Sequence, residues 1–167
     1  VQLFGEAWTG GGGRITLTAY TGRDVLNFAE RDSTFPLRLD WRWGNDLAGF
    51  GWTHPLGGGR TLDVRAGLTR FDTGITFPDF GDTDLRGRIH QWMARADVDA
   101  FAGDRFELRT GAELDRFSYD NLAVSGGTEF GSGNDTGWLV GGYAQMQWRP
   151  TDAWLLEAGL RADAWMP

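Results

Sequence analysis

Cysteine and lysine are both absent from this sequence of 167 residues. Without cysteine the chain cannot form a disulfide, a thiolate zinc site or a thiol nucleophile. All 16 basic residues are arginines, and 23 acidic residues give a net charge of −7. This balance disfavours binding to DNA or RNA through phosphates, because such binding needs a basic surface. The sequence predicts no nucleic-acid partner and no cofactor.

Long hydrophobic runs and helical periodicity are also lacking. No stretch approaches the roughly 18 consecutive apolar residues of a membrane helix, and the residues from Val1 to Glu6 lack the basic and apolar regions of a signal peptide. These absences exclude a helical membrane protein. They do not exclude a membrane β-barrel, whose signal is alternation and not a run.

Alternation of apolar and polar residues is abundant, together with 26 glycines and nine tryptophans. At 153–165, for example, Leu156, Leu160 and Ala162 alternate with Glu157 and Arg161, as in a strand with one charged face. About eight strands of about 8–14 residues are predicted in this way, with no helix between them. Their ranges are 1–8, 14–22, 46–54, 60–69, 88–101, 105–117, 137–149 and 153–165.

The connections between these strands alternate in length. Gly, Pro and Asp predict tight turns at Thr9–Gly13, Pro55–Gly59, Ala102–Asp104 and Pro150–Asp152. The other connections, 23–45, 72–87 and 118–136, are long and polar and are predicted to be loops. Short turns on one side and long loops on the other are typical of an outer-membrane barrel.

Aromatic residues gather near both ends of the predicted strands, as in the girdles of membrane barrels. The predicted interface residues are Trp8, Trp52, Phe106, Trp148 and Trp154 near the short turns, and Tyr20, Trp92, Trp138 and Trp165 towards the long loops. If the apolar face meets lipid, the opposite face lines the lumen. The predicted lumen-facing charges are Arg65, Arg95, Asp97, Glu107, Arg109, Glu113, Glu157, Arg161 and Asp163. Alternation alone also fits a soluble barrel or sandwich whose apolar face is the core.

The first and last connections are both short, so both ends of the chain are predicted on the long-loop side. A complete eight-stranded membrane barrel normally has both termini on the short-turn side. The predicted fold is therefore all-β: an antiparallel up-and-down transmembrane barrel in which residues 1–167 form one segment of a larger barrel.

Two blocks of sequence resemble the TonB-dependent receptor family. The first runs from Gly142 to Asp163 and combines a Tyr-x-Gln stretch, a Pro-Thr turn and a Gly-Leu-Arg-x-Asp strand. The second runs from Trp43 to Asp72. The resemblance implies a 22-stranded barrel with an N-terminal plug, which imports siderophores, cobalamin or saccharides with energy supplied through a TonB box. Neither plug nor TonB box is found in these residues, which fits a partial chain.

Residues suited to catalysis are few. His54 and His90 have no nucleophile or base at a recognisable spacing, so an enzyme is not expected. Asp79, Asp82 and Asp84 form an acidic cluster that could hold Ca²⁺. Their spacing does not match an EF-hand, and solvated loop charge is the preferred interpretation over a metal site.

The sequence thus predicts an outer-membrane receptor or transporter barrel for TonB-dependent uptake of a scarce nutrient. Its expected partners are the bacterial outer-membrane bilayer, a small nutrient ligand and, in the full-length protein, a plug domain and the TonB energising complex. Two alternatives remain open: a small structural or adhesive outer-membrane barrel, and a soluble ligand-binding β-barrel.

Overall fold

The computed structural model describes residues 1–30 and 37–167, which form one sheet of eight antiparallel strands in chain order. A short 3₁₀ turn, η1 (Gly10–Gly12), joins the first two strands. The strands are β1 (Gln2–Trp8), β2 (Arg14–Glu30), β3 (Leu37–Gly57), β4 (Arg60–Phe77), β5 (Thr83–Ala102), β6 (Phe106–Ser125), β7 (Thr128–Thr151) and β8 (Trp154–Met166). The predicted all-β, up-and-down arrangement is confirmed.

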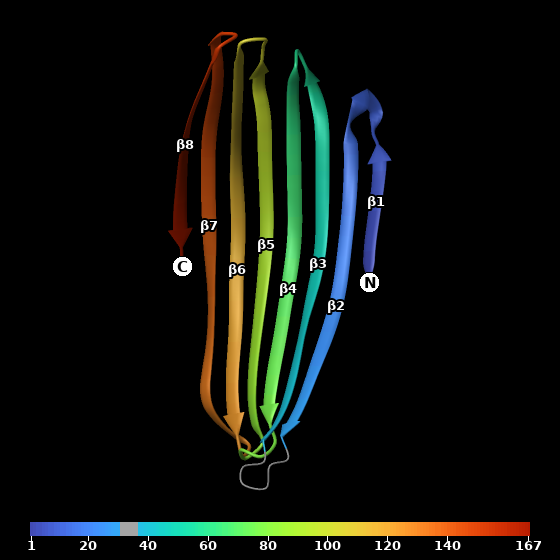
Figure 1. Ribbon diagram of the computed structural model, residues 1–167, viewed down its shortest axis with the longest axis vertical. Coiled ribbons are helices and arrows are strands. Elements are labelled where there is room, and N and C mark those ends of the chain that lie inside the picture. The colour runs from blue at the N-terminus through green and yellow to red at the C-terminus, as the bar shows by residue number, and fades with distance from the viewer. Residues whose placement is uncertain (31–36) are drawn as a thin grey trace.

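The sheet is long, curved and open (Figure 1). The short turns gather at the top of the view, and the β4–β5 and β6–β7 connections lie at the bottom. Both chain ends lie part-way down, because β1 and β8 pair only with the upper parts of β2 and β7. Each of these two end strands leaves one edge unpaired in the described sheet.

The predicted long polar loops are mostly strand, which corrects that expectation. Between β4 and β5 only Pro78–Asp82 are not strand, and between β6 and β7 only Gly126 and Gly127. These two glycines have φ of 55° and 76°, the positive values that both central residues of a tight two-residue hairpin turn need. Of the predicted loop 23–45, residues 31–36 lie outside the described residues, and the rest continue β2 and β3.

No hydrophobic side chain in the described part of the chain is buried. The only buried polar or charged residues there are Asp97 and Asp115, at 7% and 9% exposure. A single layer of sheet cannot bury either of its faces, so both need a partner or a solvent that suits them. No helix among these residues is long and apolar enough to cross a membrane.

Candidate functional site

Strand pairing divides the side chains between two faces. Directly opposed residues of neighbouring strands share a face, and successive residues along a strand alternate. We call the face that carries Phe50, Ala66 and Ala94 face A. The opposite face, which carries Arg65 and Arg95, is face B.

The polarity of the side chains on each face changes at one level across the sheet. The band runs from the short turns to the paired row Tyr20, Leu47, Thr69, Gln91, Phe117 and Gly137. The extension comprises the residues beyond that row, 21–30, 37–46, 70–90 and 118–136.

Within the band, face A is mainly apolar, with Thr110 and Arg116 among its few polar side chains. Its last row consists of Ala19, Ala48, Leu68, Trp92, Arg116 and Trp138. Many of its side chains are largely exposed; Leu160, for example, is 83% exposed. Because so wide an apolar surface is unfavourable in water, face A of the band needs an apolar environment.

Face B of the band is charged. The pairing places all nine of the predicted lumen charges there. Arg65 and Arg95 lie directly opposite one another, a repulsive arrangement. Each guanidinium instead pairs with the aspartate two residues earlier or later on its own strand, Asp63 at 2.7 Å and Asp97 at 2.8 Å. The charges of these two arginines are thus neutralised along their own strands.

Longer-range contacts join these pairs into a network. The Tyr143 hydroxyl on β7 donates to Asp97 on β5, and the Arg95 Nη2 group donates to the same hydroxyl at 3.2 Å. On β8, Arg161 pairs with Glu113 of β6 and, at 2.9 Å, with Asp163. The network therefore ties β5, β6, β7 and β8 together across face B.

A glycine makes room for the centre of this network. Gly111 on β6 lies between Asp97 and Tyr143 in the pairing register. A Cβ atom there would lie 2.3 Å from Asp97 Oδ1 and 2.5 Å from the Tyr143 ring. Only glycine allows the tyrosine and the aspartate to meet above this strand.

Beyond the band, the polarity of both faces reverses. The first extension row on face A is Thr21, Asp46, Arg70, His90, Ser118 and Thr136. All six are polar or charged, whereas five of the six residues in the row before them are apolar. The pairing is regular across this boundary, so the reversal comes from the sequence and not from a bulge.

Face A of the extension carries a ladder of ion pairs. Arg23 Nη2 lies 2.6 Å from Asp46, and Arg70 and Arg88 lie 2.5 and 2.6 Å from Asp72. Hydrogen bonds from Arg23 and Thr21 lower the pKa of Asp46 to about 2. Burial opposes ionisation of Asp72, but the two arginine hydrogen bonds outweigh it and lower its pKa. These carboxylates stay charged at neutral pH.

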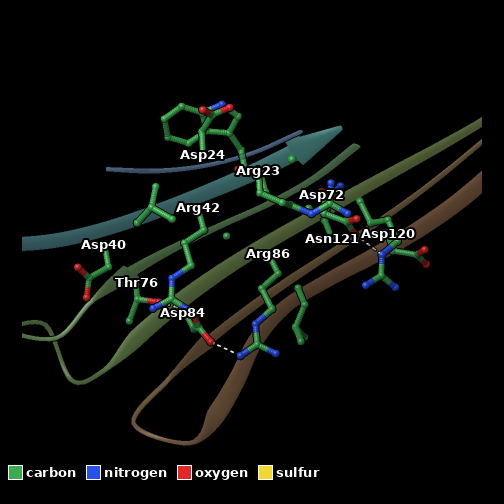
Figure 2. Close-up of a pocket in the computed structure, with 18 residues that line it drawn as sticks. Arg23, Asp24, Asp40, Arg42, Asp72, Thr76, Asp84, Arg86, Asp120 and Asn121 are labelled. Carbon is green, nitrogen blue, oxygen red and sulfur yellow. Dashed lines mark hydrogen bonds and ion pairs between the residues drawn. The ribbon is translucent and has the colours of Figure 1, made fainter. Parts of the chain in front are cut away.

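This ladder borders a cavity of about 860 Å³, shown in Figure 2. Arg42, Gly74 and Arg86 occupy one face A row, so the glycine leaves a gap between the two arginines. Arg86 forms an ion pair with Asp84, which is drawn as a dashed line in Figure 2. The cavity carries charges of both signs, which suits a hydrated surface better than a site selective for one sign.

Face B of the extension is rich in aromatic and aliphatic side chains. Trp41 and Trp43 have ring centroids 4.6 Å apart, and Trp41 Nε1 donates to Thr73 Oγ1 at 2.9 Å. Large apolar side chains from five strands share this face, namely Leu26, Phe28, Leu39, Trp41, Trp43, Phe71, Ile75, Phe77, Leu85, Ile89 and Tyr119. This apolar surface is the feature of the extension best suited to contact an organic molecule.

The predicted aromatic girdle is divided by the pairing. Trp52, Phe106, Trp92, Trp138, Trp148 and Trp154 lie on face A. Trp8, Tyr20 and Trp165 lie on face B, so the nine predicted interface residues do not share one face. The reason is the two-residue period, since Trp165 shares the parity of Arg161 and Asp163. Its ring instead covers the space over Gly137, 6.1 Å from the ring of Phe117.

The acidic residues weighed as a calcium site are separated. Asp79 pairs with Arg38 at 2.7 Å, and that hydrogen bonding lowers its pKa. Asp84 accepts from Thr76 at 2.8 Å and pairs with Arg86. Asp82 lies in the turn with φ of 50°. In the described ranges no three acidic or histidine side chains converge closely enough to hold a metal ion.

Comparisons with known proteins identify the fold. No protein-family model and no curated protein matches the sequence. The ferric yersiniabactin uptake receptor FyuA from Yersinia pestis contains a similar sheet, with a TM-score of 0.61 and 16% identity over 95% of this chain. FpvAI, solved with pyocin S2, matches 92% of the chain with a TM-score of 0.63 and 11% identity. Both are TonB-dependent receptors.

The sheet is similar in fold to part of the β-barrel of each of these two receptors. The chain spans 26% and 31% of the lengths of these two structures. Both neighbours are receptors or transporters and not enzymes.

The polarity reversal was missed from the sequence although its signal is present there. From Arg70 to Phe77, charged, glycine or threonine residues alternate with Phe71, Thr73, Ile75 and Phe77. This is the same two-residue period as in 60–69, with the faces exchanged. Because the apolar residues move to the other set of alternate positions, the segment resembles a polar loop.

Proposed function

We propose that this chain is part of the wall of an outer-membrane receptor barrel for TonB-dependent nutrient uptake in bacteria. The observation that carries the proposal is the reversal of polarity at one row across six strands. A lipid bilayer presents such a boundary, with hydrocarbon on one side and water on the other. The interior of a soluble barrel has no comparable level.

The height of the apolar band fits a membrane. Trp148 and Trp138 mark its two ends on face A of β7. They are ten residues apart, which is about 33 Å along a strand and about 25 Å when a tilt of about 40° is included. The apolar band of outer-membrane barrels is also about 25 Å tall.

Under this proposal, face A of the band contacts lipid and face B lines the lumen. The neutralised charge network on face B provides a polar wall against which a plug domain can pack in the full-length protein. Above the membrane, the ion pairs of face A contact water. The apolar surface of face B then lines the mouth of the barrel, where a siderophore, cobalamin or saccharide would first bind.

The two open edges support a segment of a larger barrel. An unpaired strand edge in a membrane leaves backbone groups without partners, so membrane sheets close. In the proposed barrel, β1 and β8 pair with further strands of the same protein.

A pair of spin labels tests the placement of the faces. These 167 residues contain no cysteine, so Ala66→Cys on face A and Arg65→Cys on face B can each be labelled singly in a full-length background from which any other cysteine has been removed. The full-length protein in lipid vesicles should show an Ala66 label accessible to oxygen but not to a nickel chelate. The Arg65 label should show the reverse. An Ala66 label that neither reagent reaches would indicate the packed core of a soluble barrel.

Uptake is tested in the cell. A strain that lacks the gene should lose growth on one member of a panel of ferric siderophores, cobalamin and oligosaccharides. The same loss should follow deletion of tonB in a strain that retains the gene. Growth unaffected across the panel would favour the structural or adhesive barrel instead.

A further inference from the structure

One cation interrupts the apolar part of face A. From the row of Trp52 to the row of Trp92, Arg116 is the only charged side chain on this face. It lies directly between Trp92 and Trp138, with which it is paired on either side. Its guanidinium carbon lies 5.6 Å from the centre of the Trp138 ring. Among the described residues it forms no ion pair, unlike Arg23, Arg70 and Arg88 of the extension.

Arg116 also borders an apolar groove of about 440 Å³ on the same face. Alanines of three adjacent strands, Ala48, Ala66 and Ala94, form part of its lining. Larger side chains, Phe50 and Leu114 among them, stand beside these alanines. Small residues between large ones leave a depression that hydrocarbon can fill.

The position of the cation at the groove defines the kind of ligand. A guanidinium on a lipid-facing surface needs an anion or water, and it pairs best with a planar or tetrahedral oxyanion. The two flanking indoles fit the level of the lipid headgroups. His90 and Ser118 face one another in the next row outward and place further polar groups beside Arg116.

We propose that face A holds one anionic lipid, with an acyl chain in the alanine groove and its phosphate on Arg116. The inference rests on the proposed function only in requiring that face A of the band contacts lipid. Charge complementarity favours a lipid over a protein partner. The apolar groove matches an acyl chain, and the cation at its end, which forms no ion pair with the described residues and lies between two tryptophans, matches a phosphate.

Native mass spectrometry of the full-length protein tests this site. The protein is purified in detergent and titrated with dioleoyl phosphatidylglycerol, dioleoyl phosphatidylcholine or inorganic phosphate. Phosphatidylglycerol should bind the wild type at one site. Arg116→Gln should weaken that binding about tenfold, the effect of losing one charge-assisted hydrogen bond. Ala94→Leu fills the groove but keeps the cation. It should weaken the binding of phosphatidylglycerol and of phosphatidylcholine, because both carry an acyl chain.

The matched control is Arg86→Gln, which removes the same charge from face A about 20 Å further along the strands. It should bind lipid as the wild type does. Arg116→Lys, which keeps the charge without the planar fork, should fall between wild type and Arg116→Gln and serves if the glutamine variant fails to fold.

Equal lipid binding by Arg116→Gln and Arg86→Gln would overturn the proposal. Inorganic phosphate that displaces phosphatidylglycerol completely would also overturn it, because the site would then recognise an anion alone. Either result leaves the proposed function intact. Failure of the proposed function has a different signature, namely a protein that stays folded without detergent and binds no lipid in any form.

Discussion

The band and the extension are built from the same strands, yet they present opposite chemistry on each face. In the band, face A is apolar and face B carries ion pairs; in the extension, face A carries the ion pairs and face B the tryptophans. Backbone pairing is continuous through the boundary. The same hydrogen-bonded sheet therefore continues through both regions, and only the side chains differ between them.

The largest effect is expected from a charge on the apolar part of face A. Ala66→Arg should destabilise the membrane-inserted protein by about 2–4 kcal/mol, because in the proposed orientation the charge lies on the lipid face midway between the rows of Trp52 and Trp92. Thr76→Arg, on the same face and strand but in the extension, should change stability by less than about 1 kcal/mol. Urea unfolding in lipid vesicles measures both. Equal effects would show that the two regions share one environment.

The strands of the band could be predicted from the sequence because the same alternate positions stay apolar along each of them. Leu62, Val64, Ala66 and Leu68 could be placed on one face without knowledge of any partner strand. The same reasoning failed in the extension. It expected apolar residues to stay on face A, as in the band, whereas in the extension they lie on face B. The Gly126-Gly127 pair could have indicated a tight hairpin at that end.

The contacts within face B were beyond sequence reasoning for a different reason. Tyr143 meets Asp97 across 46 residues of sequence. That meeting depends on the register of β5, β6 and β7 and on the space above Gly111. Alternation predicts the face on which a side chain lies, but not the neighbour it meets there.

The second prediction compares an ion pair in each region. Arg95→Met leaves Asp97, which is only 7% exposed, without its arginine. The cost should be about 1–3 kcal/mol, because a buried carboxylate loses its charged partner and keeps only the hydrogen bond from Tyr143. Arg88→Met in the extension leaves Asp72 paired with Arg70 in water and should cost less than about 1 kcal/mol. The double variant Arg95→Met with Asp97→Asn should recover part of the first loss; no recovery would mean that the arginine acts through packing alone.

The third prediction concerns two glycines of the same sheet. Gly111→Ala should destabilise the protein by about 1–2 kcal/mol, because the new methyl group would overlap Asp97 and Tyr143. Gly133→Ala in the extension has no heavy atom within 4 Å of the new methyl group, and it should be neutral or slightly stabilising. Thermal unfolding of the two variants in the same detergent tests the difference. A larger loss for Gly133→Ala would contradict the described register of β6 and β7.

The smallest expected effect is a titration confined to the extension. The hydrogen bonds from Arg23 and Thr21 lower the pKa of Asp46 from 3.8 to about 2. Because the folded-state pKa is the lower one, this pairing stabilises the fold above about pH 4, and the contribution is lost as the pH falls towards 2. Carboxyl NMR of Asp46 should therefore show a midpoint near pH 2, and Arg23→Gln should move it back towards 3.8. Since this side chain is exposed, the change in overall stability should be small. A midpoint near 3.8 in the wild type would show that water screens the ion pairs of the extension completely, and that backbone pairing alone orders face A there.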